Sequence, residues 1–225
     1  MEKKGLVLTA TDILAIDKHD SNYLCDKGAA LYKEDTFDKS VEYYRLSAAM
    51  GNDQAISNLG YCYLYGRSIE KNTSLAIAYF KIAAEKENID AAYKLGDIYG
   101  SDKWGCKDSE MSVYYYRMAA SYLLDDFSEQ EIIWTDRLDR YPSLCFALGR
   151  EFLNGENLTK DLGKSFLFLL RARDGYKKAI RDGDEFYIDS FTKVQELLKD
   201  KSFDSIREVY ERKYFEAERE WDEDE

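Results

Sequence analysis

Residues 55–84 read AISNLGYCYLYGRSIEKNTSLAIAYFKIAA, and the pattern of this stretch decides the fold. Ala55, Leu59 and Tyr63 are spaced four apart, which places them on one face of an α-helix. After a loop, Asn72 stands where a helix N-cap is expected, because its side-chain oxygen can accept a hydrogen bond from an orphan backbone N–H. The stretch therefore predicts a hairpin of two helices. The apolar stripe of the second helix is formed by Ala76, Phe80 and Ala83.

The same hairpin recurs along the chain. The repeat glycine of a later copy is Gly149, which lies 53 residues beyond Gly96 and not 36, so an insertion of 17 residues precedes that copy. Subtracting 36 from the numbers of the first hairpin recovers an earlier copy. A period in the thirties with helix-turn-helix patterning is typical of a solenoid. We therefore predict an all-α fold, a right-handed α-solenoid of about four to five helix-turn-helix repeats with terminal capping helices. Adding 36 to the numbers of the first hairpin returns Leu95, Gly96, Tyr99, Asp108, Ser112, Tyr116 and Ala119.

Glycine recurs at one position of the first helix, at Gly60, Gly96 and Gly149. Glycine in a helix interior costs about 1 kcal/mol relative to alanine, so another requirement has to favour it. The recurrence predicts that the two helices of each hairpin approach closely at this point.

The repeated pattern A-x3-L-G-x2-Y-x2-G-x2-I-x2-N-x3-A-x6-A-A resembles the Sel-one-like repeat, a relative of the tetratricopeptide repeat with a longer loop between its helices. The first copy lacks the extra loop residues, and the third has Asp102 and Gly105 where the second has Gly66 and Ile69. The resemblance implies a binding scaffold that assembles other proteins and is not itself catalytic. The four copies span residues 22–52, 55–88, 91–121 and 143–173.

The 225 residues are predicted to form a single domain, because the chain has one proline and no linker rich in glycine and serine. An N-terminal cap at 1–20 would precede four repeats at 21–173, with a helical insertion at about 122–141. Capping helices at 174–220 and an acidic tail at 221–225 would follow.

The N-terminal segment predicts a short capping helix at 9–18, whose Ile13, Leu14 and Ile16 would cover the open end of the first repeat. Lysines ahead of a short apolar run imitate a signal sequence, but Asp12 and Asp17 interrupt that run. It is too short for an exported or membrane-spanning segment. The expectation is therefore a cytoplasmic protein with no membrane contact.

The insertion predicts an extra helix that ends before Pro142. Ser128 with Glu131 three residues later forms a capping-box pattern. The helix would pack at the edge between the third and fourth repeats with Trp134 as its anchor, and a role in a partner site remains an alternative to simple packing. Its apolar face would consist of Ile132, Ile133 and Leu138.

Beyond the fourth repeat, the second helix continues toward Gly183. Two further apolar stripes, at 188–198 and 203–214, predict helices that seal the last repeat. The closing EREWDEDE is either a solvated disordered end or a docking segment for a basic partner. The stripes are formed by Ile188, Phe191, Val194, Leu197 and Leu198, and by Phe203, Ile206, Val209, Tyr210 and Tyr214.

The sequence offers no recognisable catalytic or metal site. His19 is the only histidine, so a zinc site or a catalytic triad would depend on this one residue. No phosphate-binding or nucleophile-elbow motif occurs. We expect no enzyme activity, no cofactor and no metal. The four cysteines form no C-x-x-C pair and leave reduced thiols and disulfides as alternatives: Cys25, Cys62, Cys106 and Cys145.

The expected functional feature is a groove for another protein or peptide. If the hairpins stack as in tetratricopeptide solenoids, the first helices line the concave face, and tyrosine and arginine there are typical of binding hot spots. Tyr63 and Tyr99 lie on the apolar stripe and are assigned to the core. Groove positions also include Ser57 and, in the first repeat, Asn22, Ala29, Tyr32 and Lys33. The predicted partner-binding residues are Gln54, Tyr61, Tyr65, Tyr93, Asp97, Phe146, Arg150 and Asn154.

Two functional classes remain. The first is a monomeric, non-catalytic adaptor that binds a peptide or helix in this groove. The alternative is an acidic inhibitor or immunity-type protein that masks a basic toxin or nuclease, which the net charge of −12 favours. The same charge argues against nucleic acid as a partner, because a polyanion would be repelled. The two classes differ in how strongly salt weakens binding.

Overall fold

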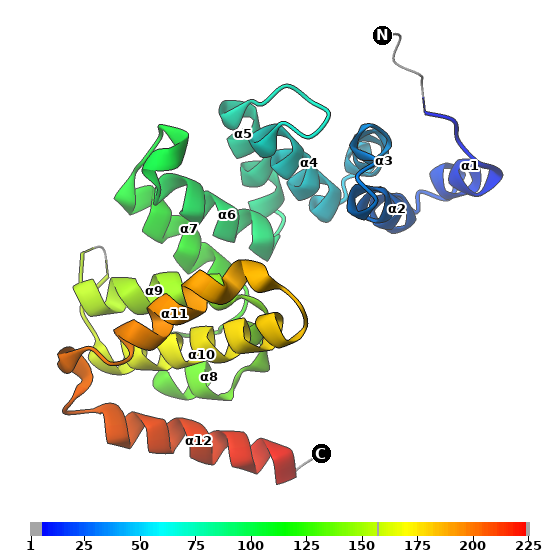
Figure 1. The fold of residues 1–225 in the computed structure, drawn as a ribbon. Coiled ribbons are helices and arrows are strands. Elements are labelled where there is room, and N and C mark those ends of the chain that lie inside the picture. The colour runs from blue at the N-terminus through cyan, green and yellow to red at the C-terminus, as the bar shows by residue number, and fades with distance from the viewer. Residues whose placement is uncertain (1–5, 157, 224–225) are drawn as a thin grey trace. The chain divides into compact units, whose positions relative to one another are not determined.

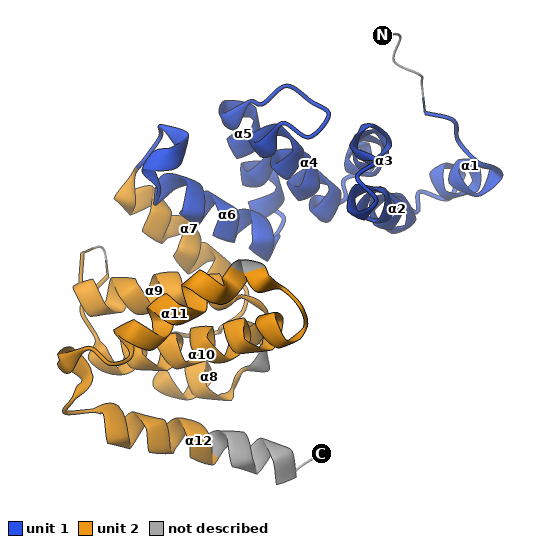
Figure 2. Ribbon diagram, viewed as in Figure 1, with its two compact units in different colours: residues 1–107 blue, residues 108–225 orange. Residues whose placement is uncertain are grey.

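The structure is a computed structural model that describes residues 6–156 and 158–223, with side chains except those of Asp136, Phe186 and residues 217–223. In these ranges the chain forms helices and no strand (Figure 1), which confirms the all-α prediction. It divides into two compact units, residues 1–107 and 108–225 (Figure 2), so the third repeat has one helix in each. The acidic tail predicted at 221–225 has side chains outside the described residues.

Unit 1 contains the first two repeats and the first helix of the third. Each helix from α2 onward packs against the next along the chain, α2 on α3, α3 on α4, α4 on α5 and α5 on α6, as in an α-solenoid. The elements are α1 (Ala10–Asp17), α2 (Ser21–Lys33), α3 (Phe37–Ala49), α4 (Asp53–Tyr65), α5 (Thr73–Ala84), α6 (Ile89–Tyr99) and the 3-10 helix η1 (Asp102–Trp104).

Unit 2 is organised around α10, the long second helix of the fourth repeat. It packs against α9 as the hairpin partner and against α8, α11 and α12. The elements are α7 (Ser109–Ser121), α8 (Glu129–Trp134), η2 (Asp136–Arg140), α9 (Pro142–Asn154), α10 (Leu162–Arg181), η3 (Glu185–Tyr187), α11 (Ile188–Leu197), η4 (Lys201–Phe203) and α12 (Arg207–Glu223).

Two of the three recurring glycines, Gly60 and Gly149, lie where two helices touch, as predicted. A Cβ added to Gly60 would lie 2.8 Å from the ring of Phe80, and one added to Gly149 would lie 2.9 Å from the side chain of Leu169. In the fourth repeat the partner helix also offers Ser165, whose hydroxyl donates to the carbonyl of Gly149 at 2.7 Å. Larger residues at these glycines would displace a packed side chain.

Helix ends are closed by the residues that the repeat pattern marks. Asn72 accepts a hydrogen bond from the backbone N–H of Leu75 at 2.9 Å, which confirms it as an N-cap. Gly66 and Gly155 end the first helices of the second and fourth repeats with φ of 71° and 72°. This left-handed conformation is unfavourable for residues with a Cβ, so it explains the two glycines.

Helix α1 turns a different side toward the repeats than the one predicted. Ile13 and Leu14 are 58% and 50% exposed, whereas Asp12 is fully buried. The prediction of an apolar covering face was wrong for these two residues, because a buried carboxylate sets the rotation of α1. Of the three predicted residues Ile16 contributes to the apolar packing, together with Ala15, Leu6 and Leu8.

Asp12 holds α1 against α2 and α3 through hydrogen bonds. Its carboxylate accepts from Lys27 on α2 at 2.6 Å and from the hydroxyl of Tyr43 on α3 at 2.9 Å. It also accepts from the backbone N–H of Thr9 at 2.7 Å, completing a capping box. Burial alone would raise the pKa of Asp12, but these bonds outweigh it and hold the pKa well below the ordinary value.

The insertion folds as the short helix α8 followed by η2; α8 packs on α10 and α12, η2 packs on α9 and α10, and Arg137 of η2 donates to the carbonyls of Tyr122 and Leu123 after α7. Trp134, the predicted anchor of this helix, is 40% exposed. The capping box is half formed: Ser128 accepts from the N–H of Glu131, but the carboxylate of Glu131 binds the N–H groups of Asp125 and Asp126. The predicted apolar face of Ile132, Ile133 and Leu138 is buried, as expected.

Arg171 of α10 is the residue that holds the insertion. Its side chain is 4% exposed and donates to the backbone carbonyls of Ile132, at 2.9 Å, and Ile133. It also pairs with the carboxylate of Asp139 at 3.0 Å. One buried guanidinium therefore binds the C-terminal end of α8 and the 3-10 helix that follows.

The C-terminal helices cover α10, as predicted for caps, with a partly different set of residues. Phe203 is fully buried, with its ring 5.0 Å from that of Phe166, and Tyr214 is 1% exposed. Ile188 and Val209, assigned to the apolar stripes, are each 47% exposed, which corrects that assignment. Both helices pack on one surface of limited width, so their outer turns remain in solvent.

The cysteines of the described chain are free thiols, and three of them are buried. Burial is the main cause that raises the pKa of Cys25 and Cys62 to about 11, and it also raises the pKa of Cys145. Since the thiolate is the reactive form, the native protein at neutral pH should react with iodoacetamide first at the half-exposed Cys106. Mass spectrometry of the alkylated protein measures this order. Equal labelling of all four cysteines before unfolding would contradict the packing.

Candidate protein-binding site

Tyr61, Tyr65 and Trp104 form a row of aromatic rings on unit 1, which we call the aromatic row. The rings of Tyr61 and Tyr65, one turn apart on α4, stack at 6.3 Å, and Trp104 of η1 meets Tyr65 edge-on at 5.9 Å. Tyr65 is 45% exposed, and the other two are half-buried. The row thus presents large, amphipathic, partly exposed surfaces to solvent.

Lysine side chains lie against this row. The ammonium groups of Lys71 and Lys103 lie 5.2 and 4.7 Å from the ring centroid of Trp104. Lys94 of α6 lies 5.6 Å from the Tyr61 ring and pairs with Asp97 at 2.8 Å. Cation–π contacts hold these lysines over the ring faces and bring positive charge to the surface of an acidic protein.

A small cavity of about 230 Å³ adjoins the row in unit 1. It is lined by Tyr32 of α2, Tyr44 of α3, and Asn58 and Tyr61 of α4. Two predicted groove positions from neighbouring repeats, Tyr32 and Tyr61, therefore come together. The cavity is wide enough for a single side chain of a bound segment.

Not every predicted groove residue on α4 is available for binding. Gln54 accepts a hydrogen bond from Asn88, the N-cap of α6, at 3.2 Å, so its amide joins two repeats. Ser57 is fully buried, which corrects its assignment to the groove. Tyr61 packs edge-on against the core residue Phe80 at 5.0 Å, so it also contributes to stability.

The remaining predicted residues lie on α6 and α9. Tyr93 and Asp97 are half-buried on α6 and flank Lys94, which lies 5.4 Å from the Tyr93 ring. In unit 2, Phe146 and Arg150 form a cation–π pair at 5.8 Å, and Asn154 is exposed at the last position of α9. These residues stay a prediction as binding residues.

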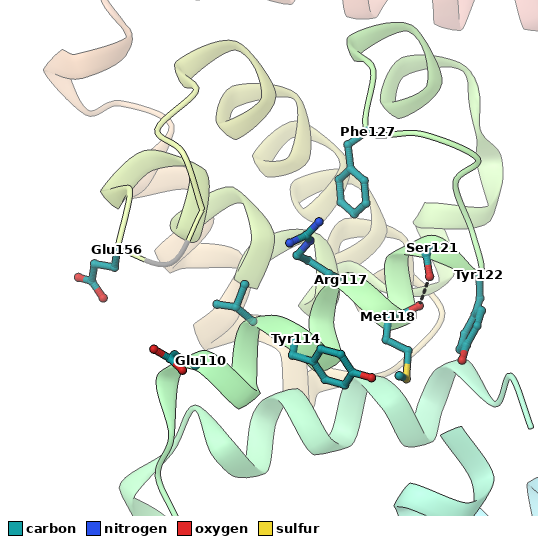
Figure 3. Close-up of a pocket in the computed structure, with 9 residues that line it drawn as sticks. Glu110, Tyr114, Arg117, Met118, Ser121, Tyr122, Phe127 and Glu156 are labelled. Atoms are coloured by element: carbon teal, nitrogen blue, oxygen red, sulfur yellow. Dashed lines mark hydrogen bonds between the residues drawn. The ribbon is translucent and has the colours of Figure 1, made fainter. Parts of the chain in front are cut away.

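Unit 2 also contains a groove that the sequence did not indicate, which we call the α7 groove. It has a volume of about 780 Å³ and follows the outer side of α7. Figure 3 shows Arg117 and Phe127 facing each other across it, with Glu110 and Glu156 at one end and Tyr122 at the other. The predicted groove was confined to first helices, whereas this groove uses a second helix and two loops.

Trp104 was likewise absent from the predicted site. It lies in the third inter-helix loop, where the chain departs from the repeat pattern and forms η1 instead. The signal that would have found it is a tryptophan in a predicted loop with Lys103 beside it, since loops are exposed and tryptophan is enriched at interfaces.

Sequence comparison decides the family. The Sel1 repeat profile matches residues 21–52, 53–88, 89–121 and 142–175, more than half of the chain. The chain belongs to the Sel1 repeat family. Proteins with Sel1 repeats are generally non-catalytic scaffolds for protein interaction. The matched segments coincide with the four predicted copies, including the one that follows the insertion.

Two solved structures are similar to the chain. A Sel1 repeat protein from Oxalobacter formigenes is 25% identical, with a TM-score of 0.44 over 69% of this chain and 94% of its own. A protective antigen of uropathogenic Escherichia coli with an SLR fold is 17% identical, with a TM-score of 0.46 over 89% of this chain and 54% of its own. No curated protein sequence matches the chain.

None of the helices in the described ranges combines the length and apolar character that a bilayer span requires. No group of three or more histidine, cysteine, aspartate or glutamate side chains within the described residues is arranged to hold a metal ion.

Proposed function

We propose that this Sel1 repeat protein is a non-catalytic adaptor that binds a segment of another protein along the aromatic row. The observation that carries the proposal is the row of contacting, partly exposed rings of Tyr61, Tyr65 and Trp104 in neighbouring repeats. Rigid aromatic rings bury large areas on binding at little entropic cost, and tyrosine and tryptophan are enriched among hot spots. The neighbouring cavity at Tyr32 and Asn58 supports the proposal, because it offers a pocket for one anchoring side chain.

The rings of the aromatic row are held in place by contacts with each other and with the core, so a partner can bind without large rearrangement. Tyr61 is fixed against Phe80, and Tyr65 is fixed between Tyr61 and Trp104. Preformed contacts of this kind reduce the ordering cost when a partner binds. The predicted residues Tyr93 and Asp97 would extend the same surface along α6.

The test replaces the two rings of the row that do not pack on Phe80, as Tyr65→Ala with Trp104→Ala. Once the partner is isolated by affinity purification, this change should weaken the complex about thirtyfold, as expected for hot-spot residues. Thermal stability should change little, because neither ring belongs to the buried core. Isothermal titration measures the affinity, and Ile82→Ala is the control, since Ile82 is a 47% exposed residue of α5 in the same unit.

The net charge of −12 keeps an acidic inhibitor of a basic protein as the second candidate. Its affinity would fall steeply with salt and would depend on surface acids. Retained binding in the Tyr65/Trp104 double variant together with loss of binding at high salt would replace the proposal with this candidate.

A further inference from the structure

The α7 groove of unit 2 continues into a second cavity. That cavity has a volume of about 490 Å³ and shares Arg117 and Phe127 with the first. Phe152 contributes to its lining, and the ring of Phe152 stacks on the core residue Phe168 at 5.9 Å. The two hollows together form an extended channel with an aromatic centre, longer than a single side chain needs.

The apolar part of the channel is in solvent. Tyr114 is 53% exposed on α7, although the next two residues, Tyr115 and Tyr116, are buried. Met118, one turn further along, and Tyr122 continue this surface (Figure 3). Exposed aromatic and methionine side chains lining a concave surface are typical of sites that accept a protein segment.

Positive charge is concentrated at the other part of the channel. Arg117, Lys160 and Lys164 line the second cavity, and none of them makes an ion pair within 4.0 Å in the part of the chain that the structure describes. The acids near them already accept backbone N–H groups: Asp161 accepts from Lys164 as the N-cap of α10, and Asp126 and Asp200 accept from Ser128 and Ser202. In a chain with 44 acidic and 32 basic residues, three unpaired cations around one cavity indicate an anionic ligand.

We propose that the α7 groove is a second docking site, which binds an acidic and aromatic segment of a partner protein. Apolar side chains of the segment pack on Tyr114, Met118 and Phe127, and its carboxylates lie beside Arg117, Lys160 and Lys164. Glu110 and Glu156 at the far end repel carboxylates, so the segment binds in one direction. The site is independent of the aromatic row, because its lining residues all belong to unit 2.

The test is selection of random displayed peptides on the full-length protein, followed by fluorescence anisotropy of the enriched peptides. We expect peptides in which aspartate or glutamate accompanies phenylalanine, tyrosine or leucine. The triple variant Arg117→Ser, Lys160→Ser, Lys164→Ser should bind them about tenfold more weakly. Circular dichroism and thermal unfolding confirm that this variant remains folded.

Two control variants test whether peptide binding depends on the α7 groove. The first tests for non-specific attraction by positive charge, and the second tests for binding at the aromatic row. The variant Lys193→Ser, Lys199→Ser, Lys201→Ser removes three exposed cations elsewhere in unit 2 and should bind the peptides as the wild type does. The Tyr65→Ala, Trp104→Ala variant should also retain this binding. The proposal would be overturned if the selection enriched basic peptides, or if no enriched peptide bound the triple Arg117/Lys160/Lys164 variant more weakly than the wild type. It would also be overturned if the lysine control variant bound the peptides as weakly as that triple variant.

Discussion

Replacing Arg171 with alanine should reduce the free energy of unfolding of unit 2 by about 3–5 kcal/mol. The buried guanidinium satisfies the carbonyls of Ile132 and Ile133 and neutralises Asp139. Without it, polar groups of the insertion stay buried with no partner, and each such group carries a desolvation cost. Urea unfolding monitored by circular dichroism measures the loss, and hydrogen exchange should show that residues 129–140 lose protection first.

Arg173 provides the matched control on the same helix. It pairs with Asp174 at 2.7 Å, and both side chains are more than a fifth exposed. An ion pair in such a position contributes about 0–1 kcal/mol, so Arg173→Ala should be far milder. If the two variants unfold at the same urea concentration, Arg171 does not hold the insertion as described.

Replacing Asp12 with alanine should destabilise unit 1 by about 3 kcal/mol and release α1 from α2 and α3. The change removes the acceptor for Lys27 and Tyr43 in a fully buried position. The cost lies at the lower end for a broken buried pair, because the Lys27 side chain is 27% exposed and can regain water. Urea unfolding and hydrogen exchange of residues 10–17 measure the effect.

The contribution of Asp12 should also depend on pH. Its pKa is lower in the folded than in the unfolded chain, so the stabilisation is present above about pH 4 and is lost as the pH falls below that value. Asp12→Asn should therefore flatten the acid limb of the stability curve. Asp17→Ala, an exposed acid on the same helix, is the control. An unchanged acid limb in Asp12→Asn would contradict the account of the network.

The repeat pattern predicted the fold well wherever local chemistry and burial agree. Asn72 and Gly66 mark helix ends through backbone requirements that act within a few residues, so sequence alone is sufficient for them. Gly60 and Gly149 recur because the facing helix leaves no room for a Cβ. Such positions repeat with the hairpin and are therefore visible as a period.

The burial of the charged residues Asp12 and Arg171 could not be predicted from the repeat pattern. Periodicity treats Asp12 as an interruption of an apolar run, whereas its partners Lys27 and Tyr43 come from two other helices. Arg171 and the carbonyls of Ile132 and Ile133 are nearly 40 residues apart, with separations of 39 and 38. Only the tertiary arrangement reveals that these groups satisfy one another.

The candidate binding residues were predicted in part. Tyr61 and Tyr65 follow from the register of the first helices, and both contribute to the aromatic row. The assignment of Ser57 to the groove was wrong because Ser57 lies on a buried side of α4, beside the buried residues Ala55, Ile56 and Leu59. Trp104 and the α7 groove arise where the third repeat and the insertion depart from the pattern, so a pattern of repeats carries no information about them.

Site-specific photo-crosslinking tests the adaptor proposal most directly. With benzoylphenylalanine in place of Tyr65, irradiation of the cells that naturally express the protein should give one discrete adduct with a partner protein. The same residue in place of Ile82, on the exposed side of α5, should give none. The Trp104→Ala change should diminish the adduct at position 65. No adduct at position 65, or the same set of adducts at positions 65 and 82, would contradict the proposal that the aromatic row binds a protein.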